Sequence, residues 1–225
     1  MFQPKPGFSA KEAWFRSPDW DDRAKAEFET RIARTRGYNR VQYARIKGFA
    51  LLESAKPEVE AAGYQLLGGI LRDPSALHHE KVAVLSVIGG HEHDKGHLED
   101  AERNLRLALT LMETNPSGST GLERIRLAEI LLARGGLAHL QEARRLLDDE
   151  ARRRPVFLST RFRLAVAAAR VSLALGDHEA GASWAAVALQ LAHAKHSGLA
   201  NHPTLGLVEL DPRQREWLES VTRAE

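Results

Sequence analysis

The chain has 225 residues and carries 32 Lys and Arg against 30 Asp and Glu, which gives a formal charge of +2 at pH 7. This near balance excludes a global attraction to nucleic acid or to an anionic membrane, although a local basic stripe stays open. The sequence has no cysteine, which excludes disulfides, thiol nucleophiles and cysteine-ligated zinc. Residues 1–14 lack the apolar core of a signal peptide, and no apolar run reaches the length of a membrane span. We therefore expect a soluble, cytoplasmic protein with no membrane among its partners.

Residues 17–37 predict the first long helix. Ser17 is expected to be its N-cap, Pro18 its first residue and Gly37 its end. Acidic residues come early in this stretch and arginines late, as the helix dipole favours. We expect residues 1–37 to form an N-terminal capping segment and helix.

Aromatic residues gather in this first segment. Trp14, Phe15 and Trp20 fit two interpretations, an exposed docking patch or a part of the core. Trp20 begins a stripe of apolar residues spaced four apart, and a stripe at helical spacing is more often core. The core interpretation is therefore the expected one, with the docking patch as its alternative.

Residues 38–196 predict four helical hairpins of about 40 residues each. Helical periodicity runs almost throughout, and the alternation typical of a half-buried strand is nowhere sustained. Small residues recur at a fixed place in each expected helix, where they let two antiparallel backbones approach closely. They are Gly48, Gly89, Ala128 and Ala169 in the first helices and Ala61, Ala101, Ala143 and Gly181 in the second helices. The chain is therefore expected to be all-α, an α-solenoid of about four antiparallel helical hairpins.

The last of these hairpins resembles a tetratricopeptide repeat. It has Ala169 in the middle of its first helix, Gly176 at the turn and Gly181 at the start of its second helix. Residues 82–116 resemble the same repeat. The period of about 40 exceeds the usual 34 residues, and the consensus tryptophan and tyrosine of the first helix are missing. The resemblance is therefore to long-helix bacterial variants of the family, with HEAT-type arrays as the open alternative.

Residues 197–225 predict a linker and a C-terminal capping helix. Asp211 and Pro212 are an N-cap and a first residue of the kind that begins a helix. The linker before them contains Gly and Pro, which favour an extended path. A solenoid needs such terminal helices because an uncapped end exposes apolar surface.

The stretch HEHDKGH, residues 91–97, has the composition of a metal site without its spacing. A zincin places His-Glu-x-x-His on one helical face, and counting from His91 the second ligand position holds a lysine. His93 and His97 are four apart, but the turn expected at Gly96 lies between them. We therefore expect a solvated polar turn and no metal site. A metal-dependent enzyme that uses this region is the least favoured alternative.

The tetratricopeptide resemblance implies a binding face, because the first helices of such arrays line a concave side that contacts peptides or protein surfaces. Mapped onto this chain, it implies contacts from Gln42, Arg45 and Phe49 in the first hairpin and from Arg163, Val166 and Arg170 in the fourth. Arg163 and Arg170 would lie about 10 Å apart along one helical face, where their guanidinium groups suit carboxylates. An equally open alternative is that these arginines pair with acidic neighbours inside the solenoid.

The expected function is non-catalytic binding of a protein or peptide, such as a peptide with an acidic segment, by a scaffold-type protein. The sequence holds no catalytic set, phosphate-binding glycine loop or cofactor motif, so neither an enzyme nor a cofactor is expected. Two alternatives stay open. One is a nucleic-acid-associated protein, with residues 34–40 and 152–155 as its basic candidates, and the other is a regulatory sensor. The sequence indicates no particular oligomeric state.

Overall fold

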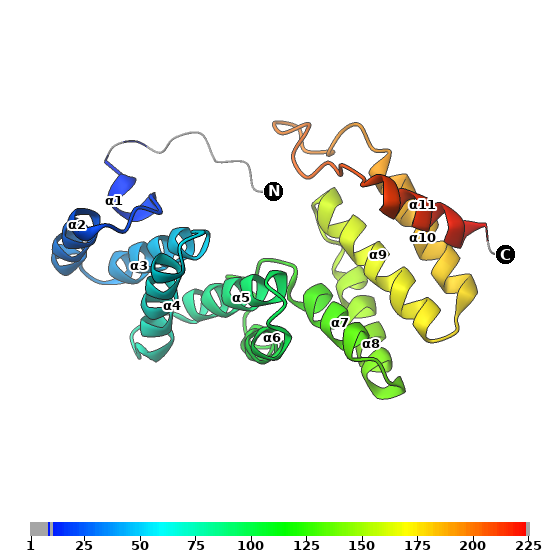
Figure 1. The fold of residues 1–225 in the computed structure, drawn as a ribbon, viewed down its shortest axis with the longest axis horizontal. Coiled ribbons are helices and arrows are strands. Elements are labelled where there is room, and N and C mark those ends of the chain that lie inside the picture. Colours follow the sequence, from blue (N-terminus) through cyan, green and yellow to red (C-terminus); the bar gives the residue numbers. More distant parts are fainter. Residues whose placement is uncertain (1–8, 10, 224–225) are drawn as a thin grey trace. The chain divides into compact units, whose positions relative to one another are not determined.

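The computed structural model describes residues 9 and 11–223, and the regular structure in this part of the chain is entirely helical. It comprises eleven helices and no strand among the residues so described (Figure 1). The prediction of an all-α protein is therefore confirmed. Of the helices in these residues, none is long and apolar enough to cross a membrane.

The chain forms two compact units. Unit 1 consists of Met1–Lys95 and Leu107–Thr120, and unit 2 consists of Gly96–Arg106 and Gly121–Glu225. Helix α6, Leu98–Met112, is divided between them.

Unit 1 contains a helical hairpin with two helices before it and one after it. Its helices besides α6 are α1 (Ala13–Arg16), α2 (Asp22–Arg34), α3 (Tyr38–Leu52), α4 (Pro57–Arg72) and α5 (His78–Asp94). Helices α3 and α4 pack on each other as the hairpin, and α5 packs on both of them. Helices α1 and α2 also contact α3.

Helix α2 begins later than the sequence predicts. Its N-cap is Asp21, whose carboxylate accepts a 2.8 Å hydrogen bond from the backbone N–H of Ala24. Ser17 lies instead at the end of α1, where its hydroxyl accepts a hydrogen bond from the backbone N–H of Asp19. The prediction of a helix start at Ser17 is wrong, because Asp21 caps the helix in its place.

The backbones of α3 and α4 approach each other closely at two glycines, Gly48 and Gly63. A Cβ atom on Gly63 would lie 3.0 Å from the carbonyl oxygen of Gly48 and 3.0 Å from the backbone nitrogen of Leu52. Gly48 therefore has the crossing role that the sequence predicts for it. Its partner is not Ala61, which is exposed, but the glycine two positions later.

An aromatic cluster packs the N-terminal segment onto α3. The ring centroid of Trp14 lies 5.0 Å from that of Phe15 and 5.2 Å from that of Tyr43. The Trp20 ring lies 5.7 Å from the ring of Phe28, and both Phe15 and Phe28 are buried. Phe15 thus belongs to the core, as the core interpretation expects, whereas Trp14 and Trp20 pack against buried rings but stay half-buried.

A buried lysine ties the loop between α1 and α2 to α3. The Nζ atom of Lys47 donates hydrogen bonds to the carbonyl oxygens of Ser17 at 2.8 Å and Asp19 at 2.9 Å. It also lies 5.3 Å from the ring centroid of Trp20. Burial lowers the pKa of Lys47 from its usual value, and the carboxylate of Asp19 acts in the opposite direction.

Unit 2 contains two helical hairpins and a final helix. Its helices besides α6 are α7 (Glu123–Arg134), α8 (Leu137–Arg153), α9 (Leu158–Ala174), α10 (His178–Ala192) and α11 (Pro212–Thr222). Helices α7 and α8 form one hairpin and α9 and α10 the other, while α9 also packs on α7 and α8. Helix α11 packs on α10.

The second hairpin of unit 2 crosses where the sequence predicts. Gly181 is buried, and a Cβ atom there would lie 2.8 Å from Leu173 Cδ2 and 3.6 Å from the carbonyl oxygen of Ala169. Helix α11 begins after Asp211, whose carboxylate accepts hydrogen bonds from two backbone N–H groups of its first turn. The apolar residues Leu207, Val208, Leu210, Trp217, Leu218 and Val221 of this C-terminal segment pack with the core of the α9–α10 hairpin.

Candidate functional site

The predicted contact residues of unit 1 lie along α3 and are engaged with their own unit. The Nε atom of Arg45 donates a hydrogen bond to the carboxylate of Glu80 on α5. The guanidinium carbon also lies 5.3 Å from the ring centroid of Phe49. Gln42 and Phe49 are partly exposed. Glu80 has 0% exposure, so Arg45 neutralises a fully buried carboxylate.

The predicted contact residues of unit 2 lie along α9 and differ among themselves. Arg163 donates hydrogen bonds of 2.9 and 2.6 Å to the two carboxylate oxygens of Glu129 on α7. The guanidinium carbon of Arg170 lies 5.2 Å from the ring centroid of Trp217 on α11. Val166 is 6% exposed and belongs to the same core cluster as Leu218 of α11.

The alternative of internal ion pairs, raised for Arg163 and Arg170, fits Arg163 and not Arg170. Arg45 and Arg163 form internal ion pairs, each with a glutamate on the neighbouring first helix. The assignment of Val166 to a contact surface is wrong, because its side chain packs in the core beneath α11. Arg170 is exposed, and its side chain forms no hydrogen bond or ion pair with any residue that the structure describes.

The histidine-rich stretch forms the end of α5 and the turn after it, and its side chains bond to α4. Nε2 of His91 donates a 2.9 Å hydrogen bond to Glu60 of α4, and Nζ of Lys95 donates bonds of 2.5 and 2.7 Å to the same carboxylate. The bonds from Lys95, and then the bond from His91, lower the pKa of Glu60. The hydroxyl of Tyr64 donates to the carboxylate of Glu92.

The solvated turn expected for this stretch is thus only partly correct. Helix α5 ends at Asp94 and Gly96 has a φ of +81°, so the turn lies where it was expected. Glu92, however, is buried, and His91 and His93 are half-buried. Among the described residues, no group of three or more His, Cys, Asp or Glu side chains is placed to hold a metal ion.

A charged network in unit 2 was not foreseen from the sequence. Arg106 donates to Glu102 at 2.7 Å and to both oxygens of Glu142 at 2.6 and 3.1 Å. Arg134 lies 2.8 Å from the second oxygen of Glu102. The hydrogen bonds that Arg106 donates to Glu142 raise the pKa of Arg106 and lower the pKa of Glu142. Helices α6, α7 and α8 are therefore linked by charge as well as by apolar packing.

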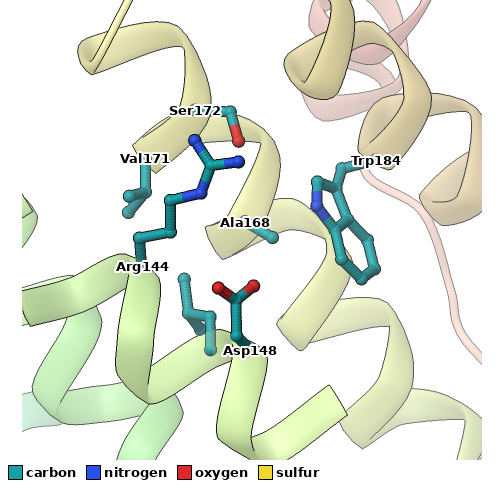
Figure 2. Close-up of a pocket in the computed structure, with 7 residues that line it drawn as sticks. Arg144, Asp148, Ala168, Val171, Ser172 and Trp184 are labelled. Atoms are coloured by element: carbon teal, nitrogen blue, oxygen red, sulfur yellow. The ribbon is translucent and has the colours of Figure 1, made fainter. Parts of the chain in front are cut away.

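A small depression lies among α8, α9 and α10 of unit 2 (Figure 2). Arg144, Asp148 and Trp184 border it, with Ser172 among the other lining residues. Its volume is about 10 Å³, which is the room that one water molecule needs. Arg144 is itself held by Asp177, through a 2.8 Å hydrogen bond from Nη1 to Oδ2. The depression is therefore too small to hold an organic ligand.

Comparisons of the chain with protein-family models, with curated proteins and with solved structures give no match. The tetratricopeptide resemblance stays a prediction from the small residues of the helical hairpins. In unit 2 the candidate contact residue on α9 is accordingly Arg170, which is exposed between buried neighbours. In unit 1 the candidate contact residues on α3 are the partly exposed Gln42 and Phe49.

Proposed function

We propose that the chain is a non-catalytic, tetratricopeptide-like helical-repeat protein that binds a protein or peptide through the first helices of its hairpins. A scaffold role in a bacterial cytoplasm is the setting that this proposal assigns to it. The partner carries an acidic segment, and Arg170 is the residue that contacts a carboxylate of that segment. Arg45 and Arg163 support the binding helices through their internal ion pairs.

The packing of first helices on one another supports this proposal. In unit 1 the first helix α3 packs on α5, and in unit 2 the first helix α7 packs on α9. Each contact carries an Arg–Glu pair, between Arg45 and Glu80 in one case and Glu129 and Arg163 in the other. The paired residues are 35 and 34 residues apart, a few residues short of the period of about 40, so each pair joins two successive first helices. Such repeated contacts are those that a stack of hairpins makes.

The state of Arg170 is the single observation that carries the choice of a binding residue. The guanidinium carbon of Arg170 lies 5.2 Å from the centroid of the Trp217 ring, and the N–H donors of this group form no hydrogen bond with a described residue. The contact with Trp217 also restricts the side chain before any partner arrives, which reduces the entropy lost on binding. Arg170 is therefore a preorganised donor for a carboxylate.

Capture of partners from an extract of the native host, followed by mass spectrometry, tests the proposal. The bait is the full chain, and it is compared with Arg170→Ala and with Arg103→Ala, which removes an exposed arginine of α6. We expect a protein with an acidic segment to be captured by the unmodified chain and by Arg103→Ala, and to be depleted with Arg170→Ala. Capture of no specific protein, or equal capture by all three baits, would contradict the proposal.

A further inference from the structure

An exposed apolar tip lies at one end of unit 2. It consists of Val156 and Phe157, which precede α9, and Leu205 in the loop before α11, with exposed fractions of 67%, 45% and 48%. The two loops touch, because a Cβ atom on Gly206 would lie 3.4 Å from Phe157 Cβ. Three large apolar side chains on two loops that touch are therefore exposed to solvent.

A basic collar adjoins this apolar tip. It consists of Arg152, Arg153 and Arg154 at the end of α8 and Arg161 in the first turn of α9, all of them exposed. Arg152 pairs with Asp149, and Arg153 lies near Glu150. The side chains of Arg154 and Arg161 form no hydrogen bond or ion pair with other described residues. Two of the four guanidinium groups are therefore free to bind anions.

The backbone at Arg154 is a second sign that the collar has a role. Arg154 has a φ of +54°, and among the described residues it is the only one other than glycine with a positive φ. A helix end of this kind favours glycine, because a Cβ atom makes the left-handed conformation less stable. An exposed, unpaired arginine thus stands where glycine would be more stable, which points to a function of its side chain.

We infer that the apolar tip and the basic collar dock unit 2 onto an anionic phospholipid surface. Protruding apolar side chains can enter the boundary between headgroups and acyl chains, while the surrounding guanidinium groups bind lipid phosphates and carboxylates. Nucleic acid would bind the arginines through its phosphates but would not contact the exposed apolar side chains of Val156 and Leu205. The contact is peripheral, and it departs from the sequence-based expectation of no membrane partner.

This inference does not depend on the proposed function, because the apolar tip and the face around Arg170 are different surfaces of unit 2. Flotation of the full chain with vesicles tests it. One set of vesicles is phosphatidylcholine alone and the other contains one quarter phosphatidylserine, each at low and at high salt. We expect the chain to float only with the anionic vesicles, and less at high salt because the charges are screened.

Matched variants separate the apolar from the basic contribution. Val156→Ser should weaken vesicle binding about tenfold. Leu137→Ser, at a residue 66% exposed at the opposite end of α8, should leave it unchanged. Arg154→Gly should weaken vesicle binding about fivefold, which is the contribution of one arginine near an anionic surface. The same substitution should retain or raise the stability of the fold, because glycine tolerates the positive φ. Circular dichroism of each variant reports the fold.

Three results would overturn the inference. The first is no flotation with anionic vesicles at low salt. The second is equal flotation of the unmodified chain, Val156→Ser and Leu137→Ser. The third is binding to a single-stranded oligonucleotide that competes with the vesicles and is insensitive to Val156→Ser, which would assign the collar to nucleic acid.

Discussion

Helices α3 and α9 are both first helices of a hairpin, but they are held by different forces. Helix α3 depends on buried charge: Arg45 meets the fully buried Glu80, and Lys47 is buried against two backbone carbonyls. Helix α9 depends on a nearly continuous run of small and apolar buried residues, and its arginines stay near the surface. Glu129, the partner of Arg163, is 24% exposed. Arginine is thus part of a buried ion pair on α3, whereas on α9 Arg163 forms a partly exposed pair and Arg170 forms none with the described residues.

The largest effect should come from Arg45→Ala. It leaves the Glu80 carboxylate buried without its cation, and the second oxygen of Glu80 already accepts no hydrogen bond from the described residues. Removing one partner of a buried pair costs about 3–5 kcal/mol of unfolding free energy. Urea denaturation measures this loss. Removing both charges with Arg45→Met and Glu80→Leu should recover most of it, and no recovery would show that the pair is not the cause.

The two glycine crossings should respond differently to one added methyl group. Gly63→Ala places a Cβ atom against backbone atoms of α3, so overpacking of roughly 1–3 kcal/mol should outweigh the gain in helix propensity. Gly181→Ala places a Cβ atom 2.8 and 2.9 Å from Cδ2 and Cγ of the Leu173 side chain, which can shift, while the nearest backbone atom is 3.6 Å away. Thermal unfolding of the two variants compares them. A larger loss for Gly181→Ala would contradict the assigned crossing geometry.

Alkaline pH should reveal the buried lysine of α3. Because the pKa of Lys47 is lowered in the folded protein, the unfolded chain binds a proton that the folded chain lacks just below the ordinary lysine pKa of 10.5. The free energy of unfolding should therefore gain a contribution that rises with pH through this window. The difference between the unmodified chain and Lys47→Met isolates it. A substitution of the exposed Lys25 is the control, since it keeps Lys47. If Lys47→Met and this control showed the same pH dependence, the contribution would not come from Lys47.

The smallest stability effect should come from Arg163→Ala. Its pair with Glu129 is bidentate but partly exposed, and pairs of that kind contribute about 0–1 kcal/mol. Urea denaturation beside Arg45→Ala gives the comparison directly. A loss for Arg163→Ala as large as that for Arg45→Ala would remove the distinction between the two helices.

Much of the helical architecture could be predicted from local sequence. Periodicity gave the helices of both hairpins of unit 2, and Gly48, Ala169 and Gly181 lie at crossings because small residues are required there. The turn at Gly96 and the start of α11 at Asp211 follow from local backbone preferences. These features are local because each depends on residues a few positions apart.

The remaining features depend on contacts between distant segments. Ser17 and Asp21 are both good caps, and the choice between them lies with the loop that Lys47 holds through two carbonyls. No local sequence pattern predicts the ion pair between Arg45 and Glu80 or the contact between Arg170 and the Trp217 ring. An acidic residue about one repeat away from an arginine is the signal that would have suggested the first of these pairs.

The most direct test of the binding role of α9 is the affinity of the captured partner, measured by titration calorimetry. A hydrogen-bonded contact between Arg170 and a carboxylate contributes roughly 1.5–3 kcal/mol, so Arg170→Ala should weaken binding about tenfold or more. Arg170→Lys should recover part of the loss, because it keeps the charge without the stacked guanidinium plane. An unchanged affinity of a folded Arg170→Ala variant would contradict the account.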